Sequence, residues 1–218
     1  MRPGDYHDDA GVQDPISKSA MVDLYQKARP TIKTGDIVLF SGRGFISWGI
    51  EKFTKSPWSH IGMVIKDDVW DIVHLWESTT LANVDDADAG KCVSGCMTTN
   101  LSSRVLDFKG KVVLRPILVP FTDADISLLA QMRKTFIGKP YEKNKLVLLR
   151  AALGWIGHSE DLTSIFCSEL VAEALQVIGR DTKGPPADSY IPSDFASTGS
   201  RFPEMAVQFG PDVVLREG

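Results

Sequence analysis

Two kinds of hydrophobic pattern divide the chain. In the first half and near the end, apolar residues alternate with polar ones or stand in short continuous runs, which is typical of β-strands. Residues 59–66 and 70–78 are two such runs separated by Asp67-Asp68-Val69, and this spacing predicts a hairpin. The strands predicted in this way are residues 37–40, 59–66, 70–78, 104–108, 111–118 and 213–216.

Elsewhere the apolar residues recur three and four positions apart, which is the helical period. The clearest helix starts at Thr122, which forms a capping box with Asp125, and stops at Gly138 and Pro140. Residues 79–103 are polar and are interpreted as one long loop. The other predicted helices are residues 17–28, 143–156 and 165–178.

The order of these elements predicts an α+β fold, with an antiparallel sheet and helices on one side of it. The chain has 218 residues, a length that suits one large domain. We interpret residues 1–16, which are rich in Asp and Gly, as a mobile N-terminal arm. Residues 17–218 are then expected to form a single domain.

Composition narrows the classes of function. Apolar residues make up 43% of the chain and charged residues 24%, with a net charge of -4, which is ordinary for a globular protein. No basic block occurs, so nucleic acid is not an expected partner.

The N-terminal segment shows no secretory signal, and no apolar run reaches the roughly 18 residues of a transmembrane segment. We expect a cytoplasmic protein, or one that enters a virion or is exported without a cleaved signal. Peripheral membrane contact through residues 146–156 stays open.

Cys167 is the first candidate for covalent chemistry. The chain has three cysteines, too few for a disulfide scaffold. Cys167 falls in the first turn of a predicted helix, where unpaired N–H groups and the helix dipole favour an anion. That position predicts a lowered thiol pKa and a reactive thiolate. The other interpretation is a buried cysteine that acts as a small hydrophobic residue.

His60 and Glu77 are candidates for a base and its partner. His60 opens one strand of the predicted hairpin and Glu77 closes the other. If Asp67 pairs with Trp70, His60 lies directly opposite Glu77, with Cβ atoms about 4.5–5.5 Å apart. The carboxylate would then hold one imidazole nitrogen and leave the other for a thiol, as in cysteine hydrolases. A slip of one residue would place the pair on opposite faces, and a surface pair without a catalytic role is the alternative.

Six short motifs occur in an order that resembles a known family. They are GDIVLF at 35–40, SHIGMVI at 59–65, WES at 76–78, GKPY at 138–141, FCSELV at 166–171 and PSD at 192–194. Together, over residues 33–196, they resemble the YiiX-like branch of the permuted NlpC superfamily of papain-fold amidases. The resemblance implies a permuted papain-like (NlpC-type) fold, in which a small antiparallel barrel-like sheet packs against helices, one of which carries the cysteine.

Carried over residue by residue, the resemblance makes Cys167 the nucleophile, His60 the base and Glu77 the third polar residue. It implies a thiol amidase or peptidase that cleaves an amide bond through a thioester acyl-enzyme. The implied substrates are peptides, peptidoglycan fragments, and acyl or lipid-linked amides. The loop with Cys92 and Cys96 lies outside the matched motifs.

Two other functions remain open. An acyltransferase or phospholipase of the lecithin retinol acyltransferase type has a related fold. Those relatives place Asn before the cysteine and Glu-His after it, whereas here Phe166 precedes Cys167 and Ser168-Glu169 follow. A non-catalytic binding module on the same fold is the third possibility, and the intact set of three candidate catalytic residues argues against it.

Further residues complete the expected site. The backbone N–H of Cys167, at a helix start, is the expected oxyanion donor. Tyr141 could add a hydroxyl group. Trp58 and Trp76 flank the motifs and could line a substrate pocket, although tryptophans near strand ends are more often part of a core.

A metal site has little support in the sequence. Cys92 and Cys96 have a spacing that zinc tolerates, and His74 could join them, but a fourth ligand is not evident. We therefore expect neither a metal nor a cofactor.

Overall fold

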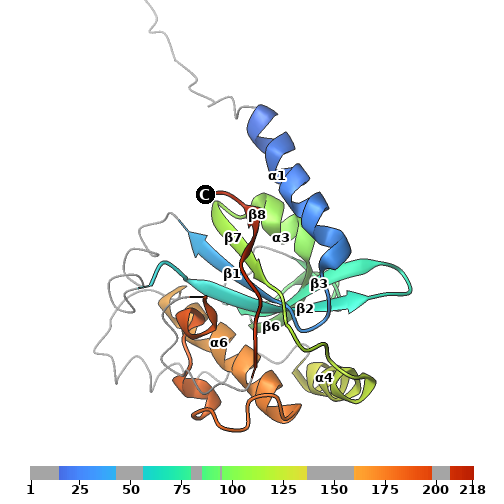
Figure 1. Ribbon diagram of the computed structural model, residues 1–218, viewed down its shortest axis with the longest axis vertical. Coiled ribbons are helices and arrows are strands. Elements are labelled where there is room, and N and C mark those ends of the chain that lie inside the picture. Colours follow the sequence, from blue (N-terminus) through green and yellow to red (C-terminus); the bar gives the residue numbers. More distant parts are fainter. Residues whose placement is uncertain (1–14, 43–55, 80–84, 94, 137–159, 198–206) are drawn as a thin grey trace, which may run out of the picture.

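A six-stranded antiparallel sheet runs through the molecule. The computed structural model describes residues 15–42, 56–79, 85–93, 95–136, 160–197 and 207–218. The strands lie in the order β6-β3-β2-β1-β7-β8, so β6 and β8 form two separate edges and the sheet is open (Figure 1). The strand bounds are β1 Ile37–Gly42, β2 His60–Asp67, β3 Ile72–Thr79, β6 Gly95–Asn100, β7 Gly110–Arg115 and β8 Val213–Arg216. β4 (Asp85–Asp86) and β5 (Lys91–Cys92) form a separate pair.

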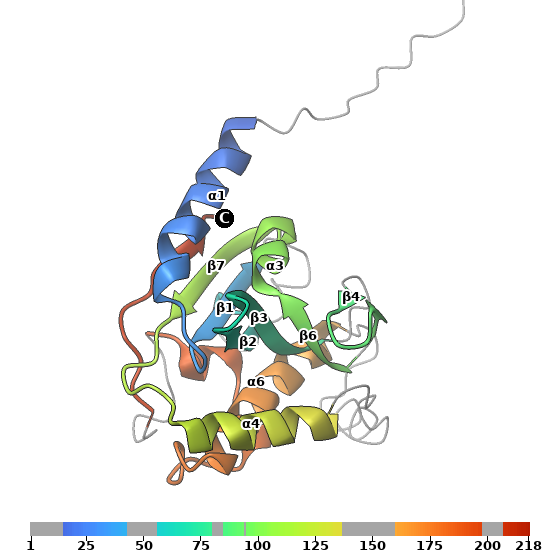
Figure 2. The ribbon, with the colours of Figure 1, turned by 90° about the vertical axis from the view of Figure 1, so that its right-hand side faces the viewer.

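Helices cover both faces of this sheet. α4 (Asp123–Phe136) and α6 (Glu160–Val177) pack on one face, which we call the α6 face (Figure 2). α1 (Pro15–Ala28) and α3 (Leu101–Asp107) pack on the other, which we call the α3 face. The short 3-10 helices are η1 Arg29–Thr31, η2 Ala187–Ser189 and η3 Pro192–Phe195. In the parts of the chain just described, no helix is long and apolar enough to cross a bilayer.

Strands β1, β2 and β3 each contribute side chains to two hydrophobic cores. Successive side chains of a strand point to opposite faces, so Ile61 and Met63 of β2 enter the core on the α6 face. Val64 of the same strand enters the core on the α3 face, together with Leu75 of β3. This explains why residues 37–40 of β1 form a continuous apolar run, since a segment of strand that is covered on both sides needs apolar residues at every position.

The predicted hairpin of β2 and β3 is confirmed, but its register differs from the expected one. Gly62, rather than His60, lies opposite Glu77, and the last pair is Asp67 with Ile72. The turn is longer than expected because the Asp67 carboxylate accepts hydrogen bonds from two backbone N–H groups of the turn. The register is displaced by two residues, an even number, so His60 and Glu77 keep the same face.

The prediction for α4 is confirmed down to its cap. The Thr122 N–H donates to Asp125 Oδ2 at 2.9 Å, and the Asp125 N–H donates to Thr122 Oγ1 at 3.2 Å. This reciprocal pair is a capping box. The last strand, predicted over residues 213–216, is β8.

Other expectations are wrong. Residues 104–108 were expected to form a strand but belong largely to α3, because the Asn100 side chain accepts hydrogen bonds from the N–H groups of Ser102 and Ser103 and so starts a helix. The expected loop over residues 79–103 contains β4, β5 and β6. Helices lie on both faces of the sheet rather than on one, and the sheet does not close into a barrel in the described residues. The helix predicted over residues 143–156 lies outside those residues, as does nearly all of the expected arm, since α1 begins at Pro15.

Candidate active site

His60 and Glu77 are in direct contact on the α3 face of the sheet. His60 Nε2 lies 2.6 Å from Glu77 Oε2, and both side chains are buried. They are diagonal neighbours on adjacent antiparallel strands, a separation that long side chains can bridge. The imidazole also lies beside the ring of Phe40, with ring centroids 5.5 Å apart.

Glu77 is fixed by two further side chains. Arg104 of α3 donates from Nε to Oε1 at 2.7 Å and from Nη2 to Oε2 at 2.8 Å. The Thr99 hydroxyl of β6 donates to Oε1 at 2.8 Å. Burial alone would raise the pKa of the Glu77 carboxyl, but the Arg104 guanidinium and the bond from His60 outweigh it and hold that pKa well below its usual range. Glu77 is therefore an ionised, fully buried carboxylate.

These contacts determine which imidazole nitrogen carries a proton. An ionised carboxylate only accepts hydrogen bonds, so His60 Nε2 must be the donor. When the ring is neutral, the other nitrogen, Nδ1, is therefore the proton acceptor. Among the described residues, Nδ1 is buried and has no hydrogen-bond partner.

Cys167 does not lie at a helix start. α6 begins at Glu160, about two turns before the cysteine. The free N–H groups of a helix belong to its first turn, so the backbone N–H of Cys167 is not the oxyanion donor that the sequence predicted.

The environment of the Cys167 thiol also differs from the expected one. The residue is 0% exposed, and burial raises the pKa of the thiol far above its ordinary value. The Ile61 N–H reaches the sulfur and opposes this rise in pKa, whereas the negative charge of Glu77 adds to it. The expectation of a lowered pKa is wrong because desolvation of the thiolate outweighs the hydrogen bonds that reach it.

The thiol and the imidazole lie on opposite faces of the sheet. Cys167 belongs to the core of the α6 face, together with Ile61. His60, one residue before Ile61, points to the α3 face with Glu77. Since His60 Nδ1 has no bonded partner in the described structure, it is not bonded to the cysteine sulfur. The sulfur nevertheless lies close to the start of β2, within reach of the Ile61 N–H.

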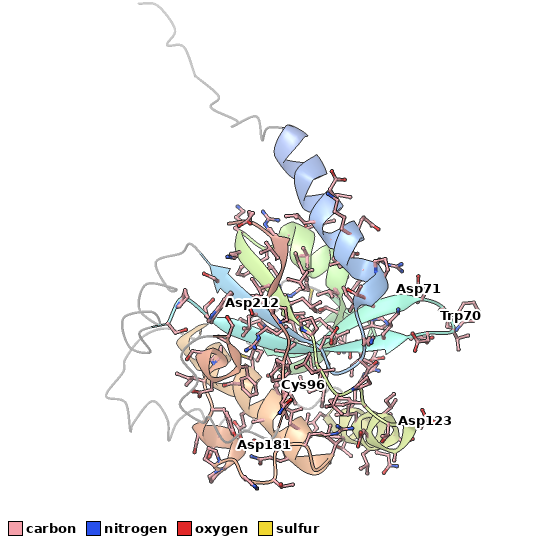
Figure 3. The ribbon with its side chains drawn as sticks, viewed as in Figure 1. Trp70, Asp71, Cys96, Asp123, Asp181 and Asp212 are labelled. Carbon is pink, nitrogen blue, oxygen red and sulfur yellow. The ribbon has the colours of Figure 1, made fainter. Side chains whose placement is uncertain are left out.

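The aromatic residues expected to line a pocket have other surroundings. Trp76 is 1% exposed, and its Nε1–H donates to the Cys96 sulfur at 2.9 Å in the core of the α6 face. Figure 3 labels Cys96 between the sheet and α6. Trp58 is partly buried and packs against the same core. Tyr141 lies outside the described residues.

The residues considered for zinc do not gather. Cys92 is exposed and donates to Asp85 Oδ1 at 3.1 Å, whereas Cys96 is buried beside Trp76. Within the ranges that the structure describes, no three His, Cys, Asp or Glu side chains form a group that could hold an ion.

Sequence reasoning did not find Arg104 and Thr99, which fix Glu77. Arg104 was assigned to a strand, and its role depends on α3. The signal that could have found it is Asn100 followed by Ser102 and Ser103, a helix cap that places Arg104 one turn into the helix.

Comparison with known proteins adds a similar solved structure. No family model and no curated protein matches the chain. Among solved structures, the chain is similar to the crystal structure of the metalloprotein YiiX from Escherichia coli O157:H7, with 26% sequence identity and a TM-score of 0.43. The match covers 66% of this chain and spans 64% of the length of that one. A YiiX-like relative is thus found, as the motifs predicted, but the similarity is too low to establish a shared fold.

Proposed function

We propose that this protein is a cysteine hydrolase in which Cys167 is the nucleophile, His60 the base and Glu77 the residue that orients the base. The observation that carries the proposal is the imidazole of His60, held at Nε2 by a buried carboxylate 2.6 Å away. Its Nδ1 is buried and unbonded among the described residues, and an imidazole held in this way offers one defined proton acceptor. The position of Cys167 adds support. The backbone N–H of Ile61, the residue that follows His60, reaches the Cys167 sulfur.

The chemistry follows from these groups. Nδ1 of His60 takes the thiol proton while the sulfur attacks the carbonyl carbon of an amide. The imidazolium returns the proton to the leaving amine, and a thioester remains. Water then attacks the thioester, giving a carboxylic acid and the free thiol. Glu77 keeps the ring in one tautomer and stabilises its charged form during both steps.

The separation of the two reacting groups sets a condition on this mechanism. In the described state the thiol is protonated and lies across the sheet from the imidazole. Catalysis therefore needs a change at the first residues of β2 that brings Nδ1 to the sulfur. His60 is the first residue of that strand and pairs with Phe40 of β1, whereas the pairing with β3 begins only at Gly62. We propose that the described state is a resting form.

The proposed substrates are those that the motifs suggest: peptides, peptidoglycan fragments, and acyl or lipid-linked amides. The YiiX structure is named a metalloprotein, but among the described residues the set around Glu77 does not fit a metal. Both oxygens of Glu77 are occupied by donors from Arg104 and Thr99. The proposed mechanism therefore uses no metal.

The test is a panel of muropeptides, acyl-amino acids and phospholipids, incubated with the protein and analysed by mass spectrometry. On a substrate that is cleaved, Cys167→Ala and His60→Ala should each lose on the order of 10² or more in turnover. The matched controls are Cys96→Ala, another buried cysteine of the same core, and His74→Ala, another histidine of the hairpin. Both controls should keep near-normal turnover. Folded Cys167→Ala protein with normal activity would end the proposal.

A second candidate is a non-catalytic binding module. It is favoured by the full burial of Cys167, the raised pKa of its thiol and its separation from His60. No product from any member of the panel, with the protein folded, would favour this candidate. Transfer of an acyl chain to an acceptor other than water would instead indicate the acyltransferase class.

A further inference from the structure

Three buried groups between β2, β3 and α3 form a set whose charges cancel. Arg104 carries one positive charge, Glu77 one negative charge, and His60 is neutral when only Nε2 holds a proton. Arg104 and Glu77 are 8% and 1% exposed, so water screens neither charge well. Other charged or titratable groups act on the set from a distance: Asp107 of α3 on Arg104, and Cys167 of α6 through its interaction with Glu77.

Removal of the positive charge from this set has a predictable consequence. Glu77 and His60 alone would carry one buried negative charge, which is costly in a medium of low dielectric constant. Uptake of one proton restores neutrality. If the proton stays on the ring, His60 becomes an imidazolium with both nitrogens protonated. If it stays on Glu77 Oε2, the carboxyl must donate to Nε2, so the ring proton moves to Nδ1. In both of these arrangements Nδ1 gains a proton. A proton on Oε1 would leave Nδ1 free, but the Thr99 hydroxyl, which now donates to Oε1, would then have to accept from it.

We propose that Arg104 is a positioning residue that keeps Nδ1 of His60 free of a proton, by neutralising Glu77 and holding its Oε2 against Nε2. The inference rests on the proposed function only for its consequence, which is that Nδ1 is available as the base. The proton arrangement itself can be measured in a protein of any function. Two parallel bonds from Arg104 hold both carboxylate oxygens, so the guanidinium sets orientation as well as charge.

The experiment is nitrogen NMR of the full chain labelled at histidine, at about pH 7.5, one unit above the ordinary imidazole value. Protonated and unprotonated nitrogens of an imidazole ring have well-separated nitrogen chemical shifts. In the wild-type protein, His60 should show a protonated Nε2 and an unprotonated Nδ1. In Arg104→Gln, Nδ1 should be protonated at the same pH. Arg104→Lys keeps the charge and should leave Nδ1 unprotonated in most molecules.

Two controls separate this role from a general loss of stability. Arg115→Gln removes an arginine that is also 8% exposed, but whose partners are the Phe195 carbonyl and Asp212. It should leave the nitrogens of His60 unchanged. Thr99→Val removes an uncharged donor to Glu77 and should also leave Nδ1 unprotonated.

Several outcomes would overturn the inference. A protonated Nδ1 in the wild-type protein does so without any variant. An unprotonated Nδ1 in folded Arg104→Gln protein does so as well. If Arg104→Gln does not fold, the test is made with Arg104→Lys. Protonation of Nδ1 in that variant would contradict the inference, because lysine keeps the positive charge beside Glu77. Loss of activity in Cys167→Ala is a separate result, so failure of the proposed function is distinguishable from failure of this inference.

Discussion

The three cysteines differ in the solvent exposure of their thiols, and this difference predicts which thiol is alkylated fastest. Cys92 is exposed, while Cys96 and Cys167 are buried. Burial raises the pKa of the Cys96 thiol to about 12, and it raises that of Cys167 as well. A thiol reacts as its thiolate, and the hydrogen bond with Asp85 raises the pKa of Cys92 as well. The difference in reactivity in the described state therefore rests on access, which both buried cysteines lack.

Alkylation with iodoacetamide at about pH 7.5 tests this difference. Cys92 should be modified at least about tenfold faster than Cys167, since a local opening of roughly 1.4 kcal/mol already gives that factor. Peptide mapping by mass spectrometry measures both rates, and Cys92→Ser protein shows the rate of Cys167 alone. Preferential labelling of Cys167 at neutral pH would mean that the protein populates a state in which its thiol is exposed and ionised.

At the scale of single residues, the sequence predicted the contact of His60 with Glu77 but not the position of Cys167 relative to them. The contact of His60 with Glu77 was predictable because strand side chains alternate with a period of two, and the register error was an even number of residues. The separation of Cys167 from His60 was not predictable, because it depends on which face of the sheet α6 covers. The anchoring of Glu77 by Arg104 depends on α3, whose residues the sequence divided between an expected loop over residues 79–103 and an expected strand over residues 104–108.

At the scale of elements, the short helix α3 carries much of the site. It has only 7 residues, and an isolated helix of that length is marginal in water. Packing of Leu101 and Val105 in the core and the cap at Asn100 therefore hold it in place. The position of Arg104 depends on these contacts, and so does the orientation of Glu77.

Replacement of the cap should weaken the protein and loosen Arg104. Asn100→Ala should cost about 1 kcal/mol in the free energy of unfolding, the usual value for a lost N-cap. Asn100→Asp still accepts the two N–H bonds and is the matched control, with little expected loss. Urea unfolding of both variants measures the difference. Equal stability of Asn100→Ala and wild type would show that the cap does not hold α3.

Element boundaries followed from the sequence where local signals decide them. The capping box of Thr122 with Asp125 and the alternation in β2 and β3 are local, and both elements were predicted. β6 was not, because Gly95–Asn100 has only two apolar side chains, Cys96 and Met97, and its pairing with β3 stabilises it. Long-range pairing of this kind overrides the local preference of the residues.

At the scale of the whole molecule, a sheet with helices on both faces forms two cores, with a charged cluster buried on one face. The α+β class was predictable from the order of strands and helices. The two-sided cover was not, because an apolar strand does not indicate which helix lies over which face. The buried ion pair of Glu77 with Arg104 forms only in the folded protein, where it lowers the pKa of Glu77. It therefore makes the stability of the whole protein depend on pH.

The sign of this dependence follows from the pKa of Glu77. In the folded protein it lies well below the ordinary value of 4.5, which the unfolded chain has. The ionised carboxylate therefore contributes stability that is fully present above about pH 4.5 and is lost as the pH falls through the folded value.

Urea unfolding from pH 7 down to about pH 3 should show a falling free energy of unfolding below pH 4.5. The double variant Glu77→Leu with Arg104→Met removes both buried charges and should have a shallower fall. Carboxylates outside the cluster titrate alike in both proteins, so the difference between the curves reports on Glu77 together with His60, which is bonded to it. Glu77→Gln alone should be destabilised by about 3–5 kcal/mol at neutral pH, because it leaves Arg104 buried without its partner. Parallel curves for wild type and double variant would show that the ion pair is absent in solution.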